Sequence, residues 1–328
     1  MTGYALLLPE VLLFVGVAWA LFADKLPGGD RGAVLIGAGM SAAAGLIAAF
    51  SPVGGELFGG LLAFDEPARF ARAGVAALAT LWMLWTWAQG EGRLREAVAL
   101  ALLSTIGTLL LCSARELITI VLALELATIP AYVLIGYRRH RSTGLEGALK
   151  YFLLSMLTSL VMLYGMSFLY GVSATTHLDG LNVADAGAIG LLAVLLTYVG
   201  LFAKLSAAPF HYWAPDAYEG AEAWSVAFVS VVPKLGGAVV LVRLTAALAE
   251  SMPTLTTLIA IAAAASMLLG NLAALSQTDV RRLMAYSGVA HAGYLMVGVA
   301  ALTPSGYGAA IFYRSEEHTS ELQSRHNL

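Results

Sequence analysis

Apolar side chains recur along this chain in runs of about 20 residues, the length an α-helix needs to cross about 30 Å of hydrocarbon. About ten such runs are present, at 4–22, 32–50, 70–88, 97–113, 116–136, 148–171, 187–213, 223–246, 255–275 and 282–301. An eleventh begins near Gly308 and stops after a few residues. None shows the strict alternation of a transmembrane β-strand. The pattern therefore predicts an all-α, polytopic membrane bundle of about ten to eleven helices.

Composition supports the same class. Of the 328 residues, 59% are apolar and 12% are charged, whereas soluble domains carry about 45–50% and about 25%. A net charge of −3 argues against nucleic-acid binding, which needs a basic face. The single cysteine, Cys112, excludes an internal disulfide and a cysteine-rich metal or Fe–S site. The expected surroundings of the chain are the lipid bilayer and other membrane proteins.

Basic residues in the loops predict the orientation of the bundle, because Lys and Arg accumulate on the inner side of a membrane. With the N-terminus outside, the inward loops carry nine basic residues and the outward loops and helix ends carry four. The inward set is Lys25, Arg31, Arg93, Arg95, Arg138, Arg139, Arg141, Arg281 and Arg282, and the outward set is Arg69, Arg72, Arg115 and Arg243. The first run has neither a basic start nor a small-residue cleavage site, so we expect a retained span.

The last residues of the chain differ in kind from the rest. After Tyr313 the sequence becomes polar and aperiodic, and it interrupts an apolar run. The stretch from Arg314 to Ser324 matches the translation of a sequencing-library adapter. We therefore expect residues 314–328 to be an adapter-derived tail on a C-terminally truncated chain.

Three lysines lie in apolar runs, where a charge costs at least about 2.5–3.5 kcal/mol on insertion scales. Lys234 is near the centre of its run and Lys204 is well inside its own, so position alone favours a functional role for both. Lys150 lies within a turn of a helix end, where its ammonium can snorkel to the interface. A structural and a functional role for Lys150 therefore stay open.

Glu125 is the acidic counterpart, near the middle of the run 116–136. A buried carboxylate needs a neighbouring cation or takes up a proton. One hypothesis is a static ion pair that joins two helices. The other is a Glu/Lys pair whose proton occupancy switches, since a desolvated lysine gives up its proton more readily.

Two histidines and a serine extend this set of candidates. His291 lies in the middle of the run 282–301, with Ser287 four residues earlier on the same helix face. His211 follows Pro209, which removes a backbone donor and disfavours a helical conformation at the preceding residue. This interruption five residues after Lys204 is similar to the broken helices of transporters, whose free ends face a polar cavity.

Other chemistry has little support in the residues. No nucleotide-binding glycine motif and no histidine or carboxylate cluster with metal-ligand spacing is present, and the 34 glycines suit close helix packing. From its residues alone, the chain is a proton or cation conductor with a lysine-rich internal path.

Several motifs in sequence order carry a resemblance to a known family. They are Leu124-Glu125-Leu-Ala-Thr-Ile-Pro-Ala-Tyr132, Glu146-Gly-Ala-Leu-Lys150-Tyr-Phe-Leu-Leu-Ser155, Lys204-Leu-Ser-Ala-Ala-Pro-Phe-His211-Tyr-Trp-Ala-Pro-Asp-Ala-Tyr-Glu-Gly220, Val232-Pro-Lys234, Gly270-Asn-Leu-Ala-Ala-Leu-Ser-Gln277, Arg281-Arg-Leu-Met-Ala-Tyr-Ser287 and Ala290-His-Ala-Gly-Tyr294. Together they resemble the subunit N family of bacterial respiratory complex I, the proton-translocating NADH:quinone oxidoreductase. The resemblance covers residues 1–313. One departure is Gly220-Ala-Glu-Ala-Trp224, where the family usually has Gly-Ala-Pro-Thr-Pro.

The resemblance implies a fold of two inverted five-helix repeats, each with one broken helix. It divides the chain into N-terminal helices over 1–93, a first repeat over 94–246 with a broken seventh helix, and an incomplete second repeat over 247–313. It also implies the proton pathway. Its members are Glu125 and Lys204 as a Glu/Lys pair, Lys150 as the sixth-helix lysine, Lys234 as the link between half-channels and His291 on the central polar axis. His211 and Ser287 are further candidates.

The resemblance implies an oxidoreductase subunit that moves protons while redox chemistry occurs elsewhere in the complex. This chain would hold no cofactor, and NADH, FMN, Fe–S clusters and quinone would belong to the parent complex. Its partners would be the other membrane subunits, in the bacterial inner (plasma) membrane. Two alternatives remain: a related Na⁺/H⁺ antiporter or hydrogenase-linked subunit, and a structural membrane scaffold with static charge pairs.

Overall fold

The computed structural model describes residues 3–22, 29–89, 94–137 and 142–313. Its α-helices are α1 (Leu8–Phe22), α2 (Gly29–Ala49), α3 (Glu66–Gln89), α4 (Arg95–Ser113), α5 (Leu117–Ile135), α6 (Ser142–Ser173), α7 (Gly187–Leu205), α8 (Trp213–Gly220), α9 (Ala223–Leu248), α10 (Leu255–Leu275) and α11 (Val280–Ala300). Residues 304–313 are also helical. Two short 3₁₀ helices, η1 (Gly3–Leu7) and η3 (Leu178–Gly180), accompany them. The predicted all-α membrane bundle is confirmed.

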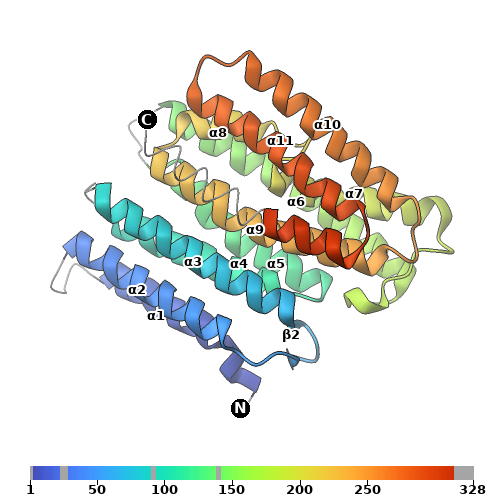
Figure 1. The fold of residues 1–328 in the computed structure, drawn as a ribbon, viewed down its shortest axis with the longest axis horizontal. Helices are drawn as coiled ribbons and strands as arrows, with labels where there is room; N and C mark the ends of the chain where they lie inside the picture. The colour runs from blue at the N-terminus through green and yellow to red at the C-terminus, as the bar shows by residue number, and fades with distance from the viewer. Residues whose placement is uncertain (1–2, 23–28, 90–93, 138–141, 314–328) are drawn as a thin grey trace.

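Nine helices in the described ranges are long and apolar enough to cross a membrane. The predicted span at 70–88 forms α3, but this helix is not among the nine. Its mean hydropathy is low because Glu66, Arg69 and Arg72 occupy its first two turns and three tryptophans occupy its last turns. The helix nevertheless lies beside α2 and α4 in the bundle (Figure 1).

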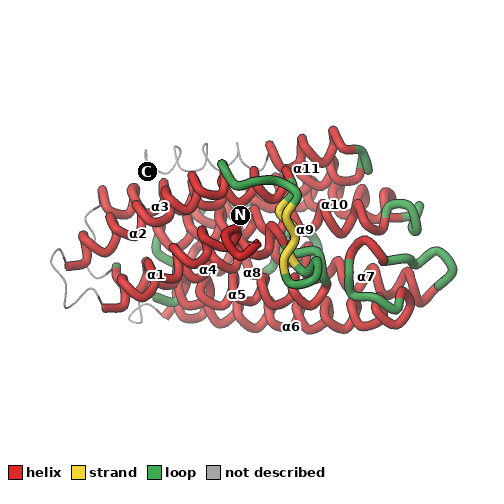
Figure 2. Tube along the Cα trace, turned by 90° about the horizontal axis from the view of Figure 1, so that it is seen from below, coloured by secondary structure: helices red, strands yellow, loops and turns green. Residues whose placement is uncertain are grey.

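The helices lie roughly side by side, with α1–α3 at one end of the bundle and α10 and α11 at the other (Figure 1). Turned by 90°, the bundle shows α6 along one side and α3 and α11 along the opposite side (Figure 2). The core surrounds α9, which packs against α3, α4, α5, α7 and α11 and is buried throughout its most apolar window. A helix buried on all faces needs no amphipathic pattern, and this explains the continuous apolar run of α9.

Close helix contacts depend on two glycines. A Cβ added at Gly107 of α4 would lie 2.4 Å from the backbone nitrogen of Ala127 in α5. A Cβ added at Gly165 of α6 would lie 2.5 Å from the backbone nitrogen of Thr197 in α7. Both distances are too short for any side chain, so these glycines allow the backbones of neighbouring helices to approach, as is typical of membrane bundles.

The predicted break in the seventh spanning helix is confirmed. Helix α7 ends at Leu205, and Ser206 follows with a left-handed backbone (φ 58°). The Ala208–Pro209 peptide bond is cis, and α8 begins at Trp213 after this non-helical segment. Pro209 has no backbone donor and restricts the residue before it, so the predicted run 187–213 becomes two helical pieces.

The structure differs from the prediction in two further places. A two-stranded antiparallel hairpin of β1 (Gly55–Leu57) and β2 (Leu62–Phe64) connects α2 to α3, although no strand was expected. Helix α6 begins at Ser142, before the apolar run 148–171, because its first turns are polar but still helical. Strands of three residues leave too short a pattern to predict.

Some predictions fall on residues outside the described ranges. Lys25, Arg93, Arg138, Arg139 and Arg141 are in this group, as is the expected tail 314–328. The predicted first repeat, 94–246, contains α4 to α8 and nearly all of α9. The region 247–313 contains α10, α11 and the helical residues 304–313. An inverted-repeat relationship between these regions stays a prediction.

Candidate functional site

The structure brings Glu125 and Lys204 together in the interior of the bundle. Glu125 lies on α5 and Lys204 lies in the last turn of α7, with 3.8 Å between Glu125 Oε1 and Lys204 Nζ. The Ser159 hydroxyl of α6 donates a 2.6 Å hydrogen bond to the same Oε1. Glu125 Oε2 is buried and accepts no hydrogen bond from the described residues. The carboxylate therefore keeps one oxygen available for a proton.

Hydroxyl groups from two helices surround the Lys204 ammonium. Its Nζ donates to Ser155 Oγ of α6 at 2.9 Å, and to Thr128 Oγ1 and Tyr132 OH of α5 at 3.2 Å each. The residue is only 6% exposed. Three acceptors match the three donors of an ammonium group. These bonds offset the cost of keeping Lys204 charged away from water.

Lys234 lies on α9 among aromatic rings. Its Nζ is 5.8 Å from the ring centroid of Trp213 and 5.6 Å from that of Tyr218, both on α8. The residue is 3% exposed. Aromatic faces attract an ammonium electrostatically, and this attraction strengthens when water is excluded. The surroundings of the Lys234 ammonium thus include two aromatic rings of the short helix α8.

A small cavity connects the two buried lysines. Lys204 and Lys234 both line it, together with Thr128 and Tyr151. Its volume of about 10 Å³ is close to what one water molecule needs. The cavity is thus large enough for about one water molecule beside both lysine side chains.

His211 lies in the segment between α7 and α8 and is 6% exposed. Its ring stacks on Tyr212 with centroids 4.6 Å apart, and it lies 6.2 Å from the ring of Tyr286 on α11. The Nδ1 atom is buried and has no hydrogen-bond partner among the described residues. The broken helix thus carries a second titratable group into the interior, beside α11.

His291 and Ser287 lie on α11, at the side of the site away from Glu125. The His291 Nδ1 atom and the Tyr313 hydroxyl are 2.5 Å apart and share a hydrogen bond. Lys234 Nζ would lie 3.7 Å from a Cβ added at Gly288. Gly288 is three residues before His291, a rise of about 4.5 Å along the helix. Lys234 therefore contacts α11 within one turn of His291.

Lys150 lies apart from this interior group. Its side chain is 44% exposed and pairs with Glu146 of its own helix at 2.8 Å and with Asp216 of α8 at 2.7 Å. Ser155, which contacts Lys204, is five residues further along α6. Of the predicted residues, the structure groups Glu125, Lys204 and Lys234 most closely and places Lys150 at a partly exposed edge.

Sequence reasoning missed the hydroxyl groups that surround the charges. Thr128 and Tyr132 lie three and seven residues after Glu125, on the face of α5 that Glu125 occupies. Ser155 and Ser159 are four residues apart on α6. Thr128 and Tyr132 could have been predicted from their helical spacing relative to Glu125. Nothing in the sequence indicates that α6 turns its serines toward the same point.

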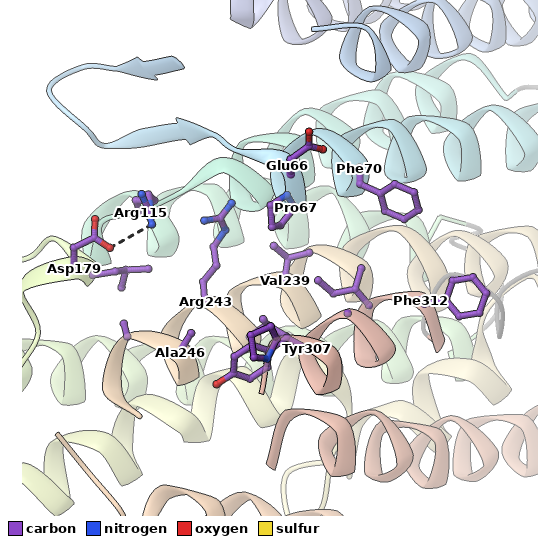
Figure 3. Close-up of a pocket in the computed structure, with 16 residues that line it drawn as sticks. Glu66, Pro67, Phe70, Arg115, Asp179, Val239, Arg243, Ala246, Tyr307 and Phe312 are labelled. Atoms are coloured by element: carbon purple, nitrogen blue, oxygen red, sulfur yellow. Dashed lines mark ion pairs between the residues drawn. The ribbon is translucent and has the colours of Figure 1, made fainter. Parts of the chain in front are cut away.

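A separate cavity of about 780 Å³ lies between α3, α9 and residues 304–313 (Figure 3). Its walls are mainly apolar, with Arg115 and Asp179 paired at 3.3 Å at one end. Arg243 also lines it and makes a bidentate pair with Asp65. None of the predicted pathway residues borders this cavity. Among the described residues, no group of three or more His, Cys, Asp or Glu side chains is arranged to hold a metal ion.

Comparison with known families gives a match over most of the bundle. The model of the family described as NADH:quinone oxidoreductase/Mrp antiporter, TM, matches residues 114–315. NADH-quinone oxidoreductase subunit N of Rubrobacter xylanophilus is 38% identical, over 94% of this chain and 67% of the relative. NADH-quinone oxidoreductase subunit N 2 of Syntrophobacter fumaroxidans is 36% identical, over 93% of this chain and 66% of the relative. The chain thus spans about two thirds of the length of these curated relatives.

Solved structures agree in fold. A chain of respiratory complex I from Thermus thermophilus with bound aureothin superposes with a TM-score of 0.76 and 29% identity, covering 95% of this chain and 69% of that chain. A chain of the Mrp complex from a Dietzia species superposes with a TM-score of 0.84 and 24% identity, covering 95% of this chain and 36% of that chain. At that identity, the second likeness shows the shared fold alone.

Proposed function

The chain belongs to the NADH:quinone oxidoreductase/Mrp antiporter membrane-subunit family, and from this membership we propose that it acts as subunit N of a bacterial NADH:quinone oxidoreductase. In that role it moves protons across the inner membrane while NADH, FMN, Fe–S clusters and quinone carry out redox chemistry elsewhere in the complex. The chain itself holds no redox centre. Its partners are the other membrane subunits and the lipid bilayer, and its N-terminus faces outward.

The proposed path runs from Glu125 through Lys204 and Lys234 to His291. One observation carries it: Lys204 lies 3.8 Å from Glu125 and shares a cavity with Lys234. Lys204, charged at rest, first gives a proton through the water-sized cavity to the neutral amine of Lys234, and the neutral Lys204 amine then takes a proton from the Glu125 carboxyl. Lys234 then passes its proton along α11 toward His291, where Ser287 extends the polar face.

Lys150 and His211 have supporting places in this proposal. Lys150 is near the half-exposed edge where protons enter from one side, and Asp216 holds it there at 2.7 Å. His211 is a buried base beside α11, with an Nδ1 atom that no described residue contacts. In this arrangement, protons enter near Lys150 and leave through His211 and His291.

Substitution of Lys234 tests the proposal. Removing a buried charge relieves an insertion cost, so Lys234→Ala should leave the complex assembled. The number of protons translocated per NADH oxidised, measured in membrane vesicles, should fall greatly or to zero, because every proton on the proposed path passes through Lys234. Glu250→Gln, a substitution of an exposed carboxylate just after α9, serves as the control.

Two results would contradict the proposal. An assembled Lys234→Ala complex with an unchanged proton-to-electron ratio would remove Lys234 from the path. Transport that requires Na⁺ and does not depend on NADH oxidation would instead identify a cation antiporter of the same superfamily.

A further inference from the structure

The aromatic surroundings of Lys234 come from a helix of only eight residues. Helix α8 carries Trp213 and Tyr218, and non-helical backbone flanks it on both sides. A helix this short is marginal by itself, so its position depends on contacts with its neighbours. Whatever holds α8 in place also determines how Lys234 is surrounded.

Asp216 lies between these two aromatic residues in α8 and connects the helix to two others. Its Oδ2 atom accepts a 2.7 Å hydrogen bond from Lys150 Nζ of α6. Its Oδ1 atom accepts a 2.7 Å hydrogen bond from Arg282 Nη1 of α11. Each carboxylate oxygen thus binds a cation from a different helix. A single side chain fixes α8 against both α6 and α11.

The same end of α11 makes further contacts with α8. Arg282 also pairs with Glu219 at 2.7 Å, and its Nε donates to Gln277 at 3.2 Å. Arg281 donates to the backbone carbonyls of Ala221 at 2.8 Å and Glu219 at 3.2 Å. These carbonyls lie at the C-terminal end of α8, where helix acceptors lack partners of their own. The charges therefore form a network, which constrains geometry more than an isolated surface pair does.

Close backbone packing makes the position of α8 sensitive to this network. A Cβ added at Gly147 of α6 would lie 2.7 Å from the Asp216 carbonyl oxygen, so the helices touch there. Tyr151 of α6 stacks on Trp213 with centroids 4.0 Å apart. A shift of α8 along α6 would move Trp213 and thereby alter the surroundings of Lys234.

We propose that Asp216 is a positioning residue for proton transfer: by binding Lys150 and Arg282 together, it holds α8 so that Trp213 and Tyr218 enclose Lys234. This inference rests on the proposed function of Lys234. It assigns Asp216 no proton of its own to transfer. The consequence is that a change at the partly exposed edge of the bundle alters a relay site in its interior.

Asp216→Asn tests this role in the assembled complex, because the amide keeps the shape of the side chain but loses its charge. Proton translocation per NADH should fall roughly tenfold, within the range that a misplacement of about 1 Å can cost. Asp216→Glu should restore a large part of it. Glu250→Gln, at an exposed carboxylate just after α9 and outside this network, is the control and should change little.

The pH profile of translocation separates positioning from a general structural role. It should shift in Asp216→Asn, because the environment of Lys234 changes, and stay unshifted in Glu250→Gln. If Asp216→Asn lowers the amount of assembled complex, Arg282→Gln provides the second test, since it removes one of the two cations. Failure of both variants to assemble would overturn the proposal in favour of a role in assembly.

The remaining outcomes distinguish this inference from the proposed function. A normal ratio and pH profile in assembled Asp216→Asn, with a low ratio in Lys234→Ala, would overturn the positioning role alone. A normal ratio in Lys234→Ala would overturn the proposed relay role of Lys234, on which the positioning role of Asp216 rests. A lowered ratio in Lys234→Ala and in Asp216→Asn, together with a ratio in Asp216→Glu that is closer to the wild type, supports both the relay role of Lys234 and the positioning role of Asp216.

Discussion

Glu125 and Lys204 lie 3.8 Å apart, yet each makes its shorter hydrogen bonds to hydroxyl groups. Lys204 donates at 2.9 Å to Ser155, and Glu125 accepts at 2.6 Å from Ser159 four residues further along α6. The pair is close enough for strong electrostatic coupling but is not locked in a direct hydrogen bond. Such an arrangement suits a pair whose protonation changes, and it leads to the first prediction.

Glu125→Gln should impair proton transfer more than Glu125→Asp. The amide keeps the hydrogen bond from Ser159 but cannot ionise, whereas aspartate remains an ionisable partner for Lys204. Leaving a buried cation without its partner costs about 3–5 kcal/mol, so the Gln variant should lose most of its translocation. Proton uptake in vesicles with equal amounts of assembled complex measures the difference. Near-wild-type activity in both variants would favour the scaffold hypothesis.

Ser155→Ala should slow transfer through Lys204 roughly tenfold, because a hydrogen bond to a charged group contributes about 1.5–3 kcal/mol. The variant removes the shortest of the three bonds that Lys204 donates. Ser167→Ala is the matched control, since Ser167 is on the same helix and, among the residues that the structure describes, its hydroxyl donates only to the Tyr164 carbonyl. Equal rates in the two variants would show that the Ser155 hydroxyl group beside Lys204 does not affect proton transfer.

A buried ion pair between Glu10 of α1 and Arg72 of α3 allows a double-mutant cycle. Arg72 is 1% exposed and donates to both Glu10 carboxylate oxygens and to the Leu6 carbonyl. Arg72→Met alone should lower the free energy of unfolding by about 3–5 kcal/mol, because it leaves a buried carboxylate unpaired. The double variant with Glu10→Leu should recover most of this loss. Thermal unfolding in detergent measures both, and additive losses would contradict the expectation.

Asp65, in the loop before α3, makes stability depend on pH. Burial by itself would raise the pKa of Asp65, but the bidentate hydrogen bonds and charge of Arg243 outweigh burial and hold the pKa below its ordinary value of 3.8. Because the folded pKa lies below the unfolded one, this stabilisation is present above about pH 4 and disappears as pH falls through the folded pKa.

Asp65→Asn tests this dependence. At pH 7 the variant should lose about 1.5–3 kcal/mol of stability, the contribution of hydrogen bonds to a charged group. The difference in melting temperature from the wild type should shrink as the pH falls below about 4, where Asp65 protonates first in the unfolded chain and, at lower pH, in the folded protein. A difference that is constant from pH 7 to pH 3 would show that the charge of Asp65 does not stabilise the fold.

The helices and the break were predictable because each has a strong local cause. Runs of about 20 apolar residues predict spans by length alone, and Pro209 predicts the interruption through its missing donor. The hairpin was not predictable, since three-residue strands carry little pattern. Helix α3 was predicted as a span from its apolar centre. The ion pair between Arg72, near the start of this helix, and Glu10 was not predictable, because the two residues are far apart in the sequence.

The candidate site was only partly predictable, for a different reason. A charged residue in an apolar run is conspicuous, so Glu125, Lys204 and Lys234 could be named without the fold. Hydroxyl residues are common in membrane helices, and only the packing of α6 against α5 and α7 shows that Ser155 and Ser159 matter. Lys150 lies in an apolar run as Lys204 does, and it was expected within a turn of a helix end. Helix α6 instead begins at Ser142, so Lys150 is about two turns inside it, where it pairs with Asp216 at a partly exposed edge.

The break between α7 and α8 also places Lys204 at the carboxyl end of a helix, whereas Lys234 lies beside side chains of the next helix. Lys204 is in the last turn of α7, and Lys234 lies 5.8 Å from the ring of Trp213, the first residue of α8. A helix carries about half a negative charge at its carboxyl end and about half a positive charge at its amino end. The carboxyl end of α7 therefore favours positive charge at Lys204. In the proposed path, a proton that leaves Lys204 gives up this stabilisation, so the dipole of α7 opposes transfer away from Lys204.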